Sequence, residues 1–146
     1  MTRKLPQSAS LATPAKGAKL YAPSAANNAE AICAVLAAHA PATGNALEIA
    51  SGTGQHVTAF ACALPGLVWQ PTEIDPQRRA SIDAYVAEAG RSNLRPAIAL
   101  DATAKVASAS GERTIKLEDF FKGPGQHAMS ADEILTEVTI PKTAAN

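Results

Sequence analysis

Hydrophobic positions between residues 29 and 100 alternate between two kinds of spacing. Three stretches place apolar residues three and four positions apart, which is the period of an amphipathic helix. Three short apolar runs follow them, each bounded by glycine, proline or other turn residues, and these runs predict buried strands. The predicted helices cover residues 29–39, 55–64 and 76–89, and the predicted strands cover residues 46–50, 67–70 and 94–100. This order predicts a parallel sheet with right-handed crossovers and helices on its faces.

After Asp101 the pattern changes to that of antiparallel β structure. Residues 104–108 and 113–117 predict two strands of a hairpin around Ser110-Gly111. Ser130 to Glu133 has the spacing of a capping box and predicts a single helical turn. Residues 134–140 alternate in polarity, which predicts a strand that Pro141 ends.

The sequence therefore predicts an α/β protein: a partial Rossmann-like, parallel three-stranded sheet with flanking helices, plus a C-terminal β-hairpin and strand extension. Residues 1–20 mix Pro, Ser, Ala and Lys without periodicity and predict a disordered leader. The α/β half covers residues 21–103, and the β-rich tail covers residues 104–146.

Composition narrows the classes of ligand. Lys+Arg and Asp+Glu balance at 13 each, so the chain has no strong field to attract nucleic acid or anionic lipid, and a small neutral or zwitterionic ligand is expected. No apolar run approaches the ~18 residues of a membrane span, and we take a cytoplasmic location as the default. Cys33 and Cys62 lack metal-site spacing and are expected to be buried free thiols, so no metal site is predicted.

The segment Leu47-Glu-Ile-Ala-Ser-Gly-Thr-Gly54 carries the candidate chemistry. A glycine-rich turn between a strand and a helix lets backbone N–H groups approach a ligand closely. Three acids lie where they would approach one edge of the predicted sheet: Glu48 within the first strand, Glu73 after the second and Asp101 at the end of the third. Glu73 lies where an acid commonly accepts hydrogen bonds from ribose hydroxyls. Asp75 competes for that role, but helix capping explains Asp75, whereas no structural role is evident for Glu73.

The stretches LEIASGTGQH, ALPGLVWQP and NLRPAIALD closely resemble a little-characterised branch of the class I S-adenosylmethionine (SAM)-dependent methyltransferases. The likeness runs from about Tyr21 to Asp101. Ala50 replaces the first glycine of the wider superfamily pattern, and Ala25-Ala26-Asn27-Asn28 replaces the Ala-Glu-Arg-Asn usual in this branch. The resemblance implies that SAM is bound by Glu48, Ala50, Ser51, Gly52, Thr53, Gly54, Glu73, Asp101 and Ala102.

Within that set, the resemblance assigns Glu48 and the turn backbone to the methionine end of SAM. It assigns Glu73 to the ribose, and Asp101 with Ala102 to the adenine. No catalytic base is assigned. His56 follows the turn, where a helix N-terminus disfavours its protonated form, and it is interpreted as a residue of the first helical turn.

The tail, GERTIKLEDFFKGPGQHAMSADEILTEVTIP, resembles the end of the FAD-binding domain of the medium subunit of molybdenum hydroxylases, of the carbon monoxide or xanthine dehydrogenase type. The glycine-rich flavin loops of that family have no match upstream, so FAD binding is not expected. Phe120 and Phe121 are then interpreted as core anchors, and His127 as a surface loop residue. The join at PAIALDAT suits either family, so the chain reads as truncated or chimeric.

In such methyltransferase folds the ligand crevice lies between the first and fourth strands. The sequence predicts no fourth strand, so only one wall of the crevice is expected. The first strand is then an exposed edge, through which self-association is expected unless residues 134–140 cover it. Three functions stay open. They are a SAM-dependent methyltransferase-like protein with little or no activity, a non-catalytic remnant or SAM-binding module, and a fragment of the FAD-binding subunit of a molybdenum hydroxylase.

Overall fold

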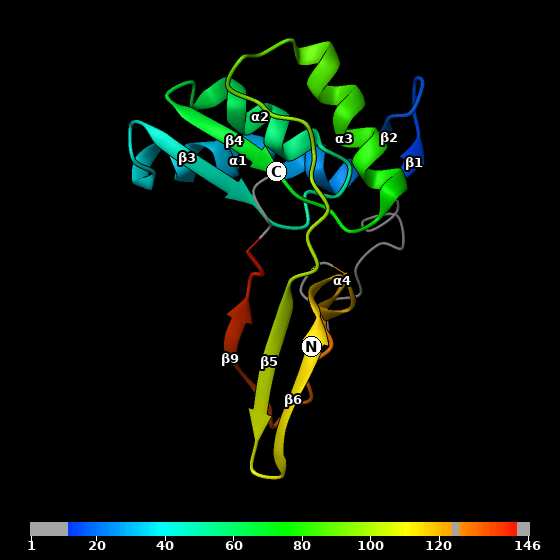
Figure 1. Cartoon of the computed structure of the whole chain (residues 1–146), viewed down its shortest axis with the longest axis vertical. Coiled ribbons are helices and arrows are strands. Elements are labelled where there is room, and N and C mark those ends of the chain that lie inside the picture. The colour runs from blue at the N-terminus through cyan, green and yellow to red at the C-terminus, as the bar shows by residue number, and fades with distance from the viewer. Residues whose placement is uncertain (1–11, 124–125, 143–146) are drawn as a thin grey trace. The chain divides into compact units, whose positions relative to one another are not determined.

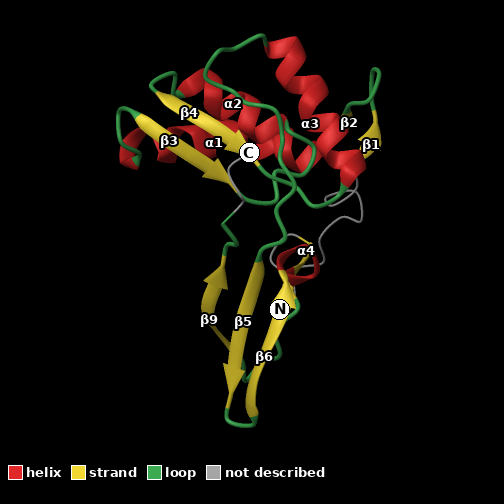
Figure 2. Cartoon of the chain, viewed as in Figure 1, coloured by secondary structure: helices red, strands yellow, loops and turns green. Residues whose placement is uncertain are grey.

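The computed structural model describes residues 12–123 and 126–142. The chain divides into two compact units, Met1–Ala99 and Leu100–Asn146 (Figure 1). The first unit holds the three long helices, and the second is built mainly of strands (Figure 2). The described residues are therefore mixed α/β.

The first unit begins with two short antiparallel strands and continues as alternating helices and strands. Its elements are β1 (Thr13–Pro14), β2 (Leu20–Tyr21), α1 (Pro23–His39), β3 (Gly44–Glu48), α2 (Gln55–Ala63), β4 (Leu67–Pro71) and α3 (Pro76–Ala89). Strands β3 and β4 are parallel, with Gly44 opposite Leu67 and Glu48 opposite Pro71. The predicted order is confirmed through the third helix, as is the parallel pairing of the first two strands of the predicted sheet.

Residues 94–100 do not form the regular third strand that the sequence predicts. This segment runs parallel to β4 but makes only two isolated bridges, Trp69 with Leu94 and Thr72 with Ile98. Pro96 lies between them and has no N–H to donate to a ladder. Its carbonyl instead accepts from Gln70 Nε2 at 2.8 Å. The sheet is thus two regular strands with an irregular third segment at the β4 edge.

The termini of α3 follow their sequence signals, whereas the start of α1 does not. Asp75 accepts the backbone N–H of Arg78 at 2.9 Å, and Gly90 adopts a left-handed conformation just after the helix, as predicted. Helix α1 begins at Pro23, earlier than the predicted Ala29. Its first turns are rich in alanine and asparagine, so the apolar periodicity that would reveal them is missing.

The core of the first unit lies between α2, α3 and β4. Phe60 and Trp69 meet with ring centroids 5.3 Å apart, and Val57 and Ile82 are fully buried. Cys33 lies half-buried on α1, but Cys62 is exposed, which corrects the expectation that both thiols are buried. The buried face of α2 is formed by Val57, Phe60 and Ala61, and the next position turns away from it.

Lys19 and Leu20 contact α3, whereas the sequence predicts a flexible leader up to residue 20. The Leu20 N–H donates to Ser81 Oγ at 2.8 Å, and Tyr85 Oη donates to the Leu20 carbonyl at 3.1 Å. Lys19 Nζ lies 4.7 Å from the centre of the Tyr85 ring and pairs with Glu88. Residues 1–11 of the predicted leader lie outside the described residues.

The second unit is a three-stranded antiparallel sheet with a small attached turn. Its elements are β5 (Thr103–Ser108), β6 (Gly111–Lys116), α4 (Leu117–Phe120), β7 (Phe121–Gly123), β8 (Gln126–His127) and β9 (Ile134–Thr139). The strand order in the main sheet is β6-β5-β9. Its core consists of Ala104, Val106, Ile115 and Phe120. The predicted hairpin, the final strand and the core position of Phe120 are confirmed, whereas the side chain of Phe121 lies outside the described residues.

One prediction for the tail is wrong. Residues 130–133 form a hydrogen-bonded turn instead of a helical turn: the Ser130 N–H donates to Glu133 Oε2 at 2.6 Å, and the Glu133 N–H donates to the Ser130 carbonyl at 3.1 Å. Within the second unit, strand β9 hydrogen-bonds to β5. Pairing within one short unit closes a shorter loop, which costs less chain entropy.

Candidate functional site

The connection from β3 to α2 is a tight turn that uses left-handed backbone at alternate positions. Ala50, Gly52 and Gly54 have φ angles of 55°, 60° and 93°. Glycine adopts such angles freely, whereas an L-residue with a Cβ loses about 1–2 kcal/mol there. Ala50 is the single non-glycine residue with positive φ among those described. Ala50 is therefore a strained position in the turn.

The two glycines of the turn have different surroundings. A Cβ on Gly54 would lie 2.8 Å from the Ile82 Cα, so the close packing of the turn on α3 requires glycine there. A Cβ on Gly52 would meet nothing nearer than the Ala50 carbonyl oxygen at 4.0 Å. The Gly52 side of the turn is thus open, and a ligand can approach its backbone.

Buried hydroxyl groups hold the turn from both sides. The Ser51 N–H donates to the Thr72 carbonyl at 2.8 Å, and Thr72 Oγ1 donates to the Glu48 carbonyl at 2.8 Å. Ser81 Oγ donates to the Thr53 carbonyl at 2.7 Å. Thr72 and Ser81 are fully buried. The sequence gives no signal for these two residues, because their role depends on contacts between segments far apart in the chain.

Glu73 has a structural role that the sequence does not reveal. Its side chain is buried, with Oε2 accepting the Gly52 N–H at 2.9 Å and Oε1 accepting the Asp75 N–H at 3.2 Å. The expectation that Glu73, unlike Asp75, has no structural role is therefore wrong. Each carboxylate oxygen can accept more than one hydrogen bond, so Glu73 keeps some capacity for a ligand.

Glu48 is the electrostatically unusual residue of the turn. Its Oε2 atom is buried and has no hydrogen-bond partner among the described residues. Burial raises the pKa of Glu48 to about 7, and the nearby Glu73 carboxylate adds to this effect, while a hydrogen bond with Ser51 opposes it. Near neutral pH this carboxyl exchanges between its neutral and charged forms.

Asp101 and Ala102, the two remaining residues implied by the resemblance, belong to the second unit. Asp101 Oδ2 lies 3.5 Å from Lys116 Nζ. Ala102 is buried, and its carbonyl accepts the Leu117 N–H at 2.8 Å. The structure therefore gathers Glu48, the residues of the turn and Glu73 in one unit, and gives Asp101 and Ala102 contacts within the other.

His56 lies in the first turn of α2, as the sequence indicates. Its Nε2 is 2.7 Å from Asn28 Oδ1 on α1, and its ring stacks on Phe60 with centroids 5.6 Å apart. Burial lowers the pKa of His56, which favours the neutral imidazole. Asn28 therefore links α1 to the first turn of α2.

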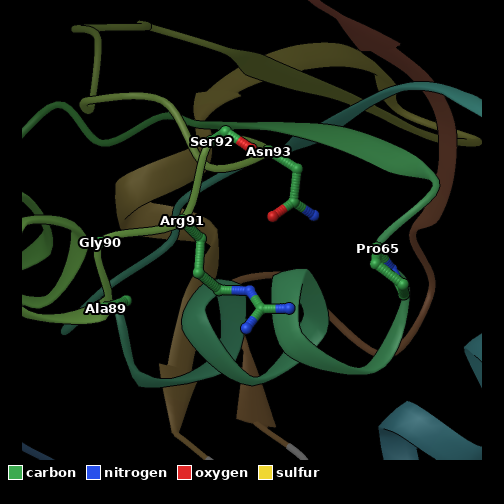
Figure 3. A pocket seen from close by; sticks show the side chains of 6 residues that line it. All are labelled: Pro65, Ala89, Gly90, Arg91, Ser92 and Asn93. Carbon is green, nitrogen blue, oxygen red and sulfur yellow. The ribbon is translucent and has the colours of Figure 1, made fainter.

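An open hollow of about 350 Å³ lies elsewhere in the first unit, at the C-terminal ends of α2 and α3 (Figure 3). Its lining residues are Pro65, Ala89, Gly90, Arg91, Ser92 and Asn93. Arg91 Nε and Asn93 Nδ2 both donate to the Ala61 carbonyl, at 3.2 and 3.0 Å. Pro65 and Asn93 precede parallel segments of the sheet. This hollow therefore lies near the N-terminal ends of these segments, whereas the glycine turn follows the C-terminal end of β3.

Residues 12–123 and 126–142 contain neither a cluster of metal-ligating side chains nor a helix suited to span a membrane. No group of three or more His, Cys, Asp or Glu residues is placed to hold a metal ion. No helix in these ranges has the length and apolar character required to cross a membrane.

The fold and the turn define an α/β protein with a strand–glycine turn–helix unit flanked by two carboxylates. The chain belongs to the family described as "Protein of unknown function (DUF938)", whose model matches residues 19–134. This match crosses the division between the two units, so it extends beyond the 21–103 segment that the sequence pattern delimits.

Two curated proteins are similar to shorter stretches. The nicotine 6-hydroxylase medium subunit of Paenarthrobacter nicotinovorans is 46% identical over 44 residues, which are 30% of this chain and 16% of that protein. The nicotinate dehydrogenase FAD-subunit of Eubacterium barkeri is 48% identical over 50 residues, which are 32% of this chain and 17% of that protein. The matched stretches are thus about one sixth of the length of these relatives. No solved structure matches the chain.

Proposed function

We propose that the first unit binds S-adenosylmethionine at the glycine turn, in a Rossmann-like manner, and that the chain by itself transfers methyl groups slowly or not at all. The observation that carries this proposal is the buried, unpartnered Oε2 of Glu48 beside a turn whose Gly52 side is open. SAM carries an ammonium and a sulfonium group, and a carboxylate without a partner is a favourable neighbour for such cations.

Glu73 can bind the ribose only through hydrogen-bonding capacity that the turn leaves unused. Its two oxygens already accept the Gly52 and Asp75 N–H groups, at 2.9 and 3.2 Å. A ribose hydroxyl would bind to the lone pairs that remain. Because the same carboxylate fixes Gly52, replacing Glu73 would disturb the turn as well as the ribose contact, and Glu73 is a poor residue for a clean test.

We expect slow methyl transfer because the sheet beside the turn has only two regular strands. Transfer requires the acceptor to be held in line with the sulfonium, in a site closed to water. Within the described residues of the first unit, β3 pairs with β4 alone, so only one side of the crevice of a complete methyltransferase is in place. We accordingly expect binding to be easier to detect than turnover.

Calorimetric titration of SAM and S-adenosylhomocysteine tests the proposal with two matched glycine variants. Gly52→Ala and Gly90→Ala both place a Cβ at a φ near +60° with open space around it. The backbone strain is therefore similar, but only Gly52 adjoins the proposed ligand. We expect Gly52→Ala to weaken binding at least about tenfold, equivalent to about 1.4 kcal/mol, and Gly90→Ala to bind as the wild type does.

Equal weakening by both variants, or no heat of binding for either ligand, would contradict SAM binding at the turn. Methyl transfer to added acceptors, measured on the same wild-type protein, would contradict only the proposed lack of turnover.

The similarity to the nicotine 6-hydroxylase and nicotinate dehydrogenase subunits favours a second candidate, a role related to FAD-binding subunits. We propose that this likeness belongs to the β-rich tail and that the tail alone does not hold FAD. Absorbance of the purified protein, followed by titration with FAD, distinguishes the two candidates. A yellow protein with bound flavin would favour the role related to FAD-binding subunits and would contradict the proposal that the tail does not hold FAD.

A further inference from the structure

Residues 19–22, which lead from β2 into α1, are bound both to α3 and to the glycine turn between β3 and α2. We call these four residues the strap. Leu20 is buried, and its carbonyl accepts the Tyr85 hydroxyl of α3 at 3.1 Å. Lys19 pairs with Glu88 and lies over the Tyr85 ring. The strap is therefore anchored to α3 by contacts that lie outside the proposed ligand site.

The first connection from the strap to the turn passes through the hydroxyl group of Ser81. The Leu20 N–H donates to Ser81 Oγ at 2.8 Å, and Ser81 Oγ donates in turn to the Thr53 carbonyl at 2.7 Å. Both hydrogen bonds are buried. A hydroxyl group that accepts a hydrogen bond becomes a stronger donor, because successive hydrogen bonds in a chain polarise one another. The bond that holds Thr53 is therefore strongest while Leu20 is docked.

The second connection passes through the side-chain amide of Gln55. Gln55 Oε1 accepts the Ala22 N–H at 2.6 Å and the Thr53 hydroxyl at 3.0 Å. An amide oxygen can accept two hydrogen bonds through its two lone pairs, so this one atom holds the strap and the turn together. Thr53 is thus joined to the strap through both its carbonyl oxygen and its hydroxyl group.

Thr53 lies between the two glycines of the turn, whose surroundings differ. Gly54 packs closely against Ile82 of α3 and cannot move toward that helix. The Gly52 side is open, and the Gly52 N–H donates to Glu73 at 2.9 Å. A displacement of Thr53 is therefore passed to Gly52 through the peptide bond that joins them. The position of Gly52, beside the proposed ligand, depends on what holds Thr53.

We propose that docking of the strap on α3 holds the glycine turn in the conformation that receives its ligand, so that strap docking and ligand binding favour each other. The ligand in this inference is the SAM of the proposed function. Such coupling is reciprocal, because the factor by which the docked strap tightens binding is also the factor by which the ligand stabilises docking. The connection itself consists of hydrogen bonds within the chain, so it can be tested both with and without SAM.

Two tyrosine variants separate the strap from the turn. Tyr85→Phe removes the hydroxyl that donates to the Leu20 carbonyl and keeps the aromatic ring beside Lys19, and it alters no group of the turn. Tyr21→Phe is the matched control, because it removes the same group from an exposed residue of the strap itself. Neither variant changes the hydrogen bonds of Ser81 or Gln55 directly.

Hydrogen exchange of the full chain without SAM, followed by NMR, tests the connection between strap and turn. We expect Tyr85→Phe to speed exchange of the Leu20 and Ala22 amides by about threefold to tenfold, the effect of losing one hydrogen bond. The Gly52 and Gly54 amides should exchange at least about twofold faster, since the hydrogen-bond chain to the turn is weakened. Tyr21→Phe should leave all four rates unchanged. Faster exchange confined to the strap, or equal acceleration throughout the first unit, would overturn the proposal.

Calorimetric titration of SAM into the same two variants tests the reciprocal half. We expect Tyr85→Phe to weaken binding by about twofold to fivefold, Tyr21→Phe to bind as the wild type does, and SAM to slow exchange of the strap amides. Equal binding by both variants, with strap exchange unchanged by SAM, would overturn the coupling and leave SAM binding intact. Absence of binding to the wild type would overturn the proposed function and the ligand part of this inference, whereas the exchange rates without SAM decide the strap–turn connection by themselves.

Discussion

Glu48 and Glu73 flank the same turn, but the protein treats their carboxyl groups differently. Glu73 accepts two backbone N–H groups, which is the arrangement that stabilises a charged carboxylate in a buried position. Glu48 Oε2 has no such partner and lies near the Glu73 charge, and the pKa of Glu48 is raised to about 7. Glu73 thus anchors the turn through two hydrogen bonds, and Glu48 responds to pH near neutrality.

The raised pKa of Glu48 predicts that the stability of the folded protein depends on pH. Because the folded state holds this proton more tightly than the unfolded state, the stabilisation is fully present below the ordinary pKa of 4.5 and is lost as the pH rises through about 7. The loss amounts to at most about 3 kcal/mol. Glu48→Gln should remove this dependence and be more stable than the wild type above neutrality.

Urea unfolding at several pH values between about 5 and 8 measures the difference between wild type and Glu48→Gln. The lowered pKa of His56 changes stability with pH in the opposite direction. Subtracting the free energies of unfolding of the two proteins at each pH cancels this contribution. The pKa of Glu133 is lowered to about 2, so its effect falls below this range. A difference that stays constant with pH would show that Glu48 is ionised like an exposed acid.

At the scale of elements, the β3–α2 turn combines a strained residue with a glycine that cannot be replaced. Ala50 has a φ of 55°, and Gly54 packs against the backbone of α3 at Ile82. The turn is held in this shape by hydrogen bonds from Thr72, Ser81 and Glu73, which lie on or near other elements. Its conformation is therefore set by the surrounding structure and not by the local sequence alone.

Two substitutions in the turn should change stability in opposite directions. Ala50→Gly relieves about 1–2 kcal/mol of strain and costs about 0.5–1 kcal/mol of chain entropy. We expect it to stabilise the protein slightly, by up to about 1 kcal/mol. Gly54→Ala adds strain at a φ of 93° and a Cβ 2.8 Å from the Ile82 Cα, and should destabilise by more than about 2 kcal/mol.

Denaturant unfolding of both variants checks this, with Gly90→Ala as the control for positive φ without a close neighbour. A loss in Gly54→Ala no larger than in Gly90→Ala would mean that α3 yields easily at Ile82.

At the scale of the whole molecule, the described cores of the two units share no residue. The first core centres on Val57, Phe60, Trp69 and Ile82, and the second on Ala104, Val106 and Ile115. Regions with separate cores commonly open as separate cooperative units. We therefore expect the two units to respond independently to damage in their cores.

Val57→Ala and Val106→Ala form a matched pair, because both side chains are fully buried. Each removes two methyl groups and should cost about 2 kcal/mol in its own unit. Hydrogen exchange followed by mass spectrometry should show faster exchange in α2 and β4 for the first variant, and in β5 and β6 for the second. Faster exchange in both units from either substitution would indicate one cooperative fold.

The sequence by itself determined the features that depend on neighbours along the chain. Asp75, Pro76 and Gly90 set both ends of α3, and Ser110-Gly111 set the hairpin between β5 and β6. These signals work locally, since caps, turns and apolar periodicity act within one or two turns of backbone.

Only the tertiary structure decided the features that depend on distant segments. The start of α1, the broken pairing at Pro96, the β5 partner of β9 and the hydrogen bond from Gly52 to Glu73 had no complete local signal. Each results from competition among many possible partners for a strand edge, a carboxylate or a buried surface. Which partner forms the contact depends on the segments that the packed chain brings together. The spacing of residues along the sequence does not specify this partner.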